Sequence, residues 1–240
     1  MSEIKTGWSI AKLQLGNIRV AYLVAGICAG VMLLQTIVAV VLLQFGIDMS
    51  GGGGNENISV AWYAWLLLLV GGIVMARGNF ARILNLGAKR GAYFWGSLWT
   101  YIVLSGAASL VVTAFSYLVD RPLTAWGQIG YFWAAPDVFG WSAHGPIVAF
   151  LQQWAFLLLL AVIVHTLTAA LDKWYGWVAA GTIITIISVF TPIAPLRHAE
   201  AAFFYLILFH PSAWAQIGAC LVLAAGIYAL NKPIFARRAV

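Results

Sequence analysis

The chain has 240 residues, of which 63% are hydrophobic and only 8% are charged. Soluble domains are about 45–50% apolar and about 25% charged, so this composition excludes a soluble enzyme, a secreted module and a disordered protein. The mean hydropathy of +0.93 agrees, and the lipid bilayer is the solvent to reason with. The net charge of +6 then indicates basic residues gathered on the cytoplasmic side of a membrane, not nucleic-acid binding.

Six apolar stretches are long enough to cross a bilayer as helices, which takes about 20 residues each. They lie at about 20–45, 60–76, 93–119, 147–171, 174–190 and 212–230. The expected fold is therefore all-α, a polytopic membrane protein in which residues 1–240 form one transmembrane domain.

The basic residues predict the orientation of this domain. With the N-terminus inside, eleven of the thirteen Lys and Arg residues face the cytoplasm, and only Arg121 and Arg197 face out. The eleven are Lys5, Lys12, Arg19, Arg77, Arg82, Lys89, Arg90, Lys173, Lys232, Arg237 and Arg238. Because cytoplasmic loops are enriched in Lys and Arg, we expect a multi-pass protein of the cell membrane with both termini in the cytoplasm.

The loop after the second apolar stretch, residues 77–91, has an amphipathic pattern. Its apolar residues recur at helical spacing and its polar residues fall on another face. The apolar face holds Phe80, Ile83, Leu84 and Gly87, and the polar face holds Asn79, Arg82 and Asn85. Asn79 suits a helix start, and Gly87 followed by Lys89 and Arg90 is typical of a helix end. The pattern predicts a short cytoplasmic helix over 78–90.

Two interpretations of this helix remain open. Acidic membrane lipids can hold it at the interface. Alternatively it docks onto a cytoplasmic partner, with Phe80, Ile83 and Leu84 filling a groove while a basic end fixes the orientation.

The residues of this loop also carry a family resemblance. The pattern of Arg82, Leu84, Leu86, Gly87 and Arg90, followed by Tyr93, Phe94 and Gly96, resembles the inner loop of small ATP-binding-cassette permeases of the second export type. In that family the loop is a coupling helix that sits in a cleft of the ATP-hydrolysing subunit. The resemblance implies an ATPase docking site made of Asn79, Phe80, Arg82, Ile83, Leu84, Leu86, Lys89 and Arg90.

The same resemblance implies a layout for the whole chain. Such permeases have about six spans, and the interfacial segment 1–18, with Ile4, Trp8 and Ala11 on one face, matches their amphipathic N-terminus. They work in pairs, so a second permease subunit, identical or paralogous, is expected. Gly26 and Gly30 form a small-residue motif that suits this dimer contact, although packing within one chain explains it equally.

A proline-bounded stretch precedes the last apolar segment. Pro192 and Pro195 open it, Pro211 closes it, and the apolar run 201–209 is too short to span. The resemblance implies a re-entrant segment over 192–211 on the outer side, and an ordinary outer loop is the alternative. The polar residues at its two ends would form an outer gate: Arg197, His198, Glu200 and His210.

No nucleotide-binding loop occurs in the chain. The nearest approach, Gly91 to Gly96 followed by Ser97, lacks the lysine that a phosphate loop needs. We therefore expect no enzymatic activity and no cofactor in this chain, with ATP and Mg²⁺ bound by the partner subunit.

Two other classes of function compete with the exporter. A haem- or metal-handling protein would use the outer histidines together with an aromatic loop, although the spacing of His144, His198 and His210 matches no ligand motif. That loop holds Trp126, Tyr131, Phe132, Trp133, Phe139 and Trp141, which an interfacial aromatic belt also explains. An ion-coupled carrier usually needs a carboxylate near the midplane, and no apolar stretch holds one there. His165, within the fourth stretch, is expected to be structural.

Overall fold

The computed structural model describes residues 3–17, 57–59, 62–122, 125, 132–190 and 193–237, and separate positions between 22 and 45. In this part of the chain helices dominate, which confirms the all-α class. The only strands there, β1 (Asn57–Ile58) and β2 (Phe132–Trp133), have two residues each and pair in parallel. Four described helices are long and apolar enough to cross a membrane: Trp62–Asn85, Arg90–Asp120, Pro146–Ala170 and Ala213–Phe235.

These four helices correspond to the predicted spans at 60–76, 93–119, 147–171 and 212–230. The first predicted span, 20–45, lies mostly outside the described residues. The fifth forms α9 (Trp174–Phe190), whose 17 residues are fewer than the roughly 20 of a typical span. The described part of the chain thus supports a membrane protein, with four long apolar helices and one shorter one.

Each long helix is built from shorter elements. The first comprises α3 (Trp62–Val74), the π-helical η1 (Met75–Asn79) and α4 (Phe80–Asn85). The second comprises α5 (Arg90–Phe115) and the π-helical η2 (Ser116–Asp120). The third is α8 (Pro146–Ala170), and the fourth comprises α11 (Ala213–Ala229) and α12 (Asn231–Arg237). The short α7 (Ala135–Val138) and the 3-10 helix η3 (Trp141–His144) precede α8.

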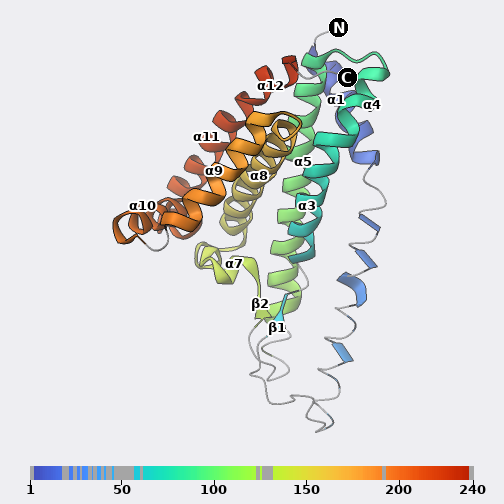
Figure 1. Ribbon diagram of the computed structural model, residues 1–240. Helices are drawn as coiled ribbons and strands as arrows, with labels where there is room; N and C mark the ends of the chain where they lie inside the picture. The colour runs from blue at the N-terminus through green and yellow to red at the C-terminus, as the bar shows by residue number, and fades with distance from the viewer. Residues whose placement is uncertain are drawn as a thin grey trace.

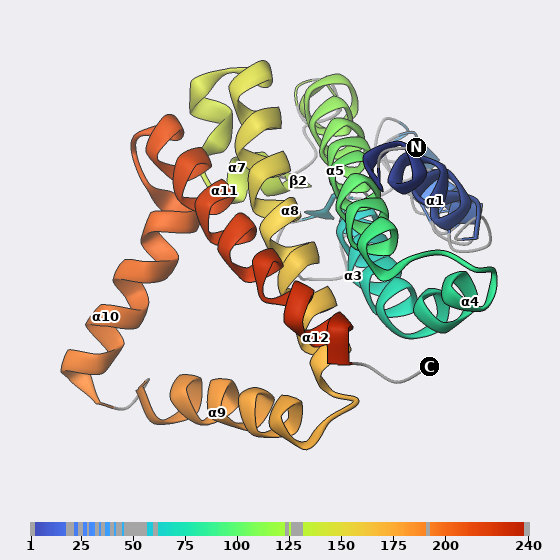
Figure 2. The same ribbon diagram turned by 90° about the horizontal axis from the view of Figure 1, so that it is seen from above.

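Helix α8 lies in the middle of the bundle and contacts α3, α5 and α11 (Figures 1 and 2). Hydrogen bonds from side chains to backbone carbonyls join it to α5 directly. The Ser109 hydroxyl donates to the Phe150 carbonyl at 2.8 Å, and the Trp154 indole donates to the Ile102 carbonyl at 3.1 Å. Such bonds matter between membrane helices, because lipid and protein attract apolar side chains equally well.

Buried glutamines connect α8 to its neighbours further along the bundle. Gln152 donates to Gln216 of α11 at 2.5 Å, and Gln216 donates to the Ile207 carbonyl at 2.9 Å. Thr113 of α5 donates to Gln153 at 3.3 Å. Because a buried amide is costly without a partner, these bonds favour one register among α5, α8 and α11.

The two ends of the bundle differ in character. We call the end with both termini, α1, α4 and α12 the terminal end, and the end with η2, α7 and η3 the loop end (Figure 1). Most of the described basic residues lie on elements or turns at the terminal end: Lys5, Lys12, Arg77, Arg82, Lys89, Arg90, Lys173, Lys232 and Arg237. The fold therefore collects at one end cations that are far apart in the sequence.

Helix α1 (Glu3–Asn17) packs into the bundle instead of lying on it as the expected interfacial segment. Ala11 and Gln14 are fully buried against α5. The Gln14 amide donates to the Ser97 hydroxyl at 3.3 Å and accepts from the Thr100 hydroxyl at 2.7 Å. Of the apolar residues noted in this segment, Ala11 is buried by the contact with α5, whereas Trp8 is 43% exposed.

Glycines make the close crossing of α1 and α5 possible. A Cβ on Gly96 would lie 2.7 Å from Ile10 Cγ2 and 3.0 Å from the Gly7 carbonyl oxygen. The first separation is shorter than real Cβ contacts, and the second is tighter than nearly all of them. The absence of a Cβ at position 96 therefore allows α1 to pack closely against α5.

We expect Gly96→Ala to destabilise the protein by about 1–2 kcal/mol. Overpacking costs about 1–3 kcal/mol, and the better helix propensity of alanine offsets part of this. Thermal unfolding in detergent should show a lower Tm by roughly 2–8 °C. Gly226→Ala on α11 is the matched control, because a Cβ there meets nothing within 4 Å. Equal melting of the two variants would contradict the crossing.

The remaining helices lie to one side of the bundle. From the terminal end α9 leads to α10 (Ala194–Phe204), which continues as the π-helical η4 (Tyr205–Phe209) and turns at Pro211 into α11. Figure 2 shows α9, α10 and α11 along three sides of a triangle. Helix α10 has no buried residues, whereas Ile207 of η4 is buried against α11.

Candidate functional site

A tight turn joins the first two membrane-length helices at the terminal end. Gly87 has φ of +84°, its N–H donates to the Leu84 carbonyl at 2.9 Å, and the Ala88 N–H donates to the Ile83 carbonyl at 3.3 Å. This pair of bonds is a Schellman motif, which ends a helix with a glycine in the left-handed conformation. The helix end predicted at Gly87 is confirmed, and it gives the turn a defined shape.

The start of this helix differs from the predicted one. The chain is helical without interruption from α3 through η1 into α4, so no separate helix begins at residue 78 and none continues to residue 90. The Asn79 side chain makes no capping bond; its Oδ1 accepts from the Asn17 side-chain amide at 3.4 Å. The side chain that suggested a cap is used instead for a contact with α1.

The buried side of α4 packs on elements from both ends of the chain. The Phe80 ring stacks on Phe235 of α12 at 5.1 Å and meets Tyr93 of α5 edge-on at 5.1 Å. Ile83 and Ile10 of α1 are buried in the same group. We call Ile10, Phe80, Ile83, Tyr93 and Phe235 the brace cluster. It ties α4 to α1, α5 and α12.

Two residues predicted to enter a partner's groove are therefore placed differently. Phe80 and Ile83 are each 1% exposed and pack inside their own chain. The physical reason is that α12, which continues α11, brings the Phe235 ring against Phe80 as an apolar surface within the same chain. Leu84 is half-buried, and Leu86 is 70% exposed.

The outer side of the turn is strongly basic. We call its exposed residues Arg77, Arg82, Leu86, Lys89 and Arg90 the basic face. No Asp or Glu occurs between residues 57 and 119 of the sequence, so the segment that forms the turn is itself purely cationic. A projecting leucine among guanidinium and ammonium groups suits an apolar groove lined by carboxylates, or the headgroups of anionic lipids.

His165 lies deep in the bundle, below the brace cluster. It is fully buried, and its Nδ1 is 2.6 Å from the Tyr101 hydroxyl. Its ring lies 5.4 Å from that of Phe235 and 6.3 Å from that of Tyr228. It connects α5, α8, α11 and α12, which agrees with the expected structural role.

An aromatic group fills the core near the loop end. Trp65 stacks with Phe139 at 5.9 Å and lies 5.3 Å from Phe156, while Trp141 donates its indole N–H to the Leu208 carbonyl at 2.9 Å. Trp141 is 1% exposed. Phe139 and Trp141 are therefore core residues and not part of an interfacial belt. The positions of Trp126 and Tyr131, and the side chains of Phe132 and Trp133, lie outside the described part.

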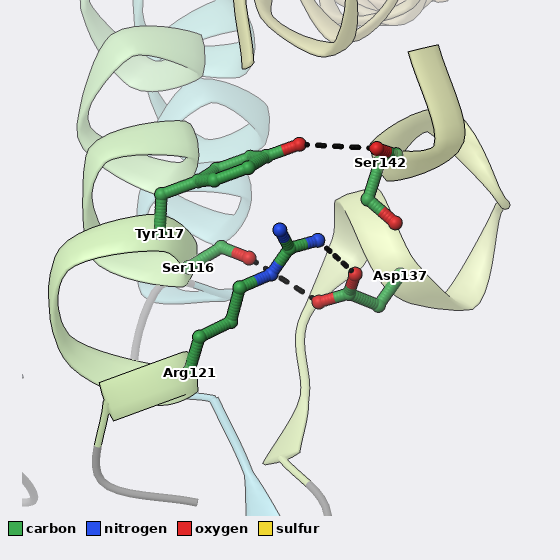
Figure 3. A network of polar contacts seen from close by, with 5 residues as sticks. All are labelled: Ser116, Tyr117, Arg121, Asp137 and Ser142. Atoms are coloured by element: carbon green, nitrogen blue, oxygen red, sulfur yellow. Dashed lines mark hydrogen bonds and ion pairs between the residues drawn. The ribbon is translucent and has the colours of Figure 1, made fainter. Parts of the chain in front are cut away.

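A polar network joins α7 and η3 at the loop end to the second membrane-length helix (Figure 3). Arg121 donates to Asp137 of α7 at 2.8 Å, and the Ser116 hydroxyl donates to the same carboxylate at 3.3 Å. The Arg121 guanidinium also lies 4.0 Å from the centre of the Tyr117 ring, whose hydroxyl donates to the Ser142 carbonyl at 3.3 Å. Desolvation lowers the pKa of Arg121, but the bond and charge of Asp137 outweigh it and leave this pKa raised, so the ion pair persists.

The predicted outer-gate residues do not form one cluster. Arg197 and His198 are exposed on α10, and Glu200 is half-buried there. His210 lies beyond η4, about 18 Å along the helix from His198 at 1.5 Å per residue. His210 accepts from the Ser212 N–H at 3.1 Å, and His144 contacts the Pro211 carbonyl at 3.2 Å, so the histidines here fasten the turn before α11.

The small-residue motif of the first predicted span faces outward. Gly26 and Gly30 are both helical and exposed, and a Cβ on either one meets no atom within 4 Å. In the described part of the chain this motif is therefore not used for internal packing.

Among the described residues, no group of three or more His, Cys, Asp or Glu side chains is placed to hold a metal ion. No family model matches the chain, and comparisons with curated proteins and with solved structures found no match.

Proposed function

We propose that this chain is the permease subunit of an ATP-driven exporter and that the basic face docks onto a separate ATP-hydrolysing subunit. The observation that carries the proposal is a rigid basic turn with an exposed leucine between two membrane-length helices. Leu86 and the half-buried Leu84 then enter the partner's groove, and Arg82, Lys89 and Arg90 orient the contact. Asn79, Phe80 and Ile83 lie on the buried side of this segment and hold the turn in place.

The packing around α4 supports transmission of force from this turn. Because the brace cluster joins α4 to α1, α5 and α12, a push on the basic face moves four elements together instead of bending one loop. In the proposed cycle, closure of the ATPases shifts the first two membrane helices and opens the path outward. No residue of this chain performs covalent chemistry, and ATP with Mg²⁺ stays in the partner.

The proposal also includes the orientation of the chain in the membrane and its assembly with a second subunit. The cation-rich terminal end faces the cytoplasm of a cell membrane crossed six times, and the chain pairs with a second permease subunit. The outward-facing Gly26 and Gly30 suit that contact. The segment 192–211 re-enters the outer leaflet, with the exposed Arg197 and His198 near one end and His210 at the other.

The test is isolation of the full-length chain from its native membranes in mild detergent. An ATPase should co-purify with it and hydrolyse ATP in the complex. Separated from that subunit, the chain should not bind ATP, because it has no phosphate-cradling loop. Saturable ATP binding by the lone chain would contradict the proposal, and a haem absorption band would favour the haem-handling alternative.

A further inference from the structure

A groove lies between α5, α8 and α11 in the half of the bundle nearer the terminal end. Its volume is about 330 Å³, at the lower end of the roughly 300–1,000 Å³ of small-molecule sites. Phe94 and Leu98 line it from α5, Val162 from α8, and Ala225 and Tyr228 from α11. Ala225 is exposed, so the groove opens on the outside of the bundle, where lipid surrounds a membrane protein.

The lining is almost entirely apolar, and its polar side-chain groups are the Trp95 indole N–H and one hydroxyl. Its one hydroxyl, that of Tyr228, donates to the Phe94 carbonyl at 2.5 Å, and Tyr228 is 3% exposed. The Phe94 and Tyr228 rings pack at 4.6 Å and belong to the part of the lining nearest the terminal end. A polar solute would lose its hydrogen bonds with water on entry, whereas an alkyl chain has none to lose.

Two basic residues lie one helical turn beyond the groove, one on α5 and the other on the helix that contains α11. Arg90 precedes Phe94 by four residues on α5, and Lys232 follows Tyr228 by four residues in the continuous helix Ala213–Phe235. Residues four apart share a helix face, so both cations lie above the groove toward the terminal end. Both side chains are exposed, and no Asp or Glu occurs from residue 201 to residue 240, the segment that contains Lys232.

We propose that this groove binds an anionic phospholipid of the leaflet at the terminal end. One acyl chain lies between α5 and α11, and the phosphate lies beside Lys232 and Arg90. Basic sites between membrane helices recognise anionic headgroups in this way. The proposal does not depend on the exporter function, since it rests on groove and charge alone.

The test is native mass spectrometry of the full-length chain with phosphatidylglycerol or phosphatidylcholine of identical acyl chains. The unmodified chain should retain phosphatidylglycerol in preference. Attraction of one cation to an anionic surface corresponds to about a fivefold change, so Lys232→Gln should lower phosphatidylglycerol retention by about that factor and leave phosphatidylcholine unchanged.

Variants that fill the groove test the contact with the acyl chain independently of the contact with the headgroup. Ala225→Trp should lower retention of both lipids, whereas Val222→Trp, 72% exposed on the same helix and outside the groove, should not. Ala229→Trp is a second filling variant should the first not fold, as Tm in detergent will show. Equal retention by the filling variant and by Val222→Trp overturns the site, and equal retention of the two lipids by the unmodified chain overturns its anionic specificity.

Discussion

Replacing Arg82 by Glu and Leu86 by Asp should reduce recovery of the ATPase with this chain by at least about tenfold. Leu86 is 70% exposed, and burying a leucine in a partner contributes about 1.5–3 kcal/mol. Loss of even the lower figure is about a tenfold weaker complex. Reversal of Arg82 adds repulsion from a carboxylate-lined groove. The measurement is co-purification from native membranes, with ATPase turnover in the complex as a second readout.

The control for this variant is another charge reversal at the same end of the bundle. Lys173 is exposed in the turn between α8 and α9, outside the basic face, and Lys173→Glu should leave recovery of the ATPase unchanged. The Tm of the double variant should also stay close to that of the unmodified chain, since both side chains are exposed. If the double variant still recovers its ATPase in full, the basic face binds lipid instead and the docking role is wrong.

Phe80→Ala should greatly reduce the stability of the protein, unlike the double variant, whose Tm should hardly change. Phe80 is 1% exposed and contacts two aromatic rings at 5.1 Å, and truncation of a buried Phe costs about 3–5 kcal/mol. For a chain of this size the Tm in detergent should fall by roughly 6–20 °C. Docking should weaken as well, because α4 loses its attachment to α12.

Leu86→Ala is the matched control, because it truncates an exposed apolar residue in the same segment. Its Tm should stay within the range of surface substitutions, which change stability by about 0.5 kcal/mol or less. Equal melting of Phe80→Ala and Leu86→Ala would mean that α4 does not pack on α12, and the rigid coupling proposed for the turn would fall with it.

Local signals in the sequence predicted local features of the fold. Of the six predicted apolar stretches, four correspond to long helices in the described part of the chain, because the length of an apolar run decides whether its helix can cross a bilayer. Gly87 predicted a helix end because a left-handed residue favours glycine whatever surrounds it. The expected grouping of Lys and Arg agrees with the elements that meet at the terminal end.

Contacts between distant segments were not predictable in the same way. Phe80 and Ile83 fall on an apolar helix face that suits a partner's groove as well as Phe235 of the same chain. Within the membrane, lipid accepts apolar side chains as readily as protein does, so hydropathy does not tell which face of α5 or α8 is buried. The Gln152–Gln216 pair carried a usable signal, since two amides in apolar stretches need partners and each supplies one for the other.

The brace cluster has a consequence for biosynthesis. Phe80 and Phe235 are 155 positions apart in the chain, and synthesis at about 5–20 residues per second separates their appearance by roughly 8–30 s. During that interval α4 has already been made but lacks the ring that holds it. The hydrogen bonds within residues 83–88 form locally, so a nascent chain has the shape of the turn before Phe235 completes the brace cluster that holds α4 in place. Partner recruitment through this turn would then distinguish chains that have reached α12 from those that have not.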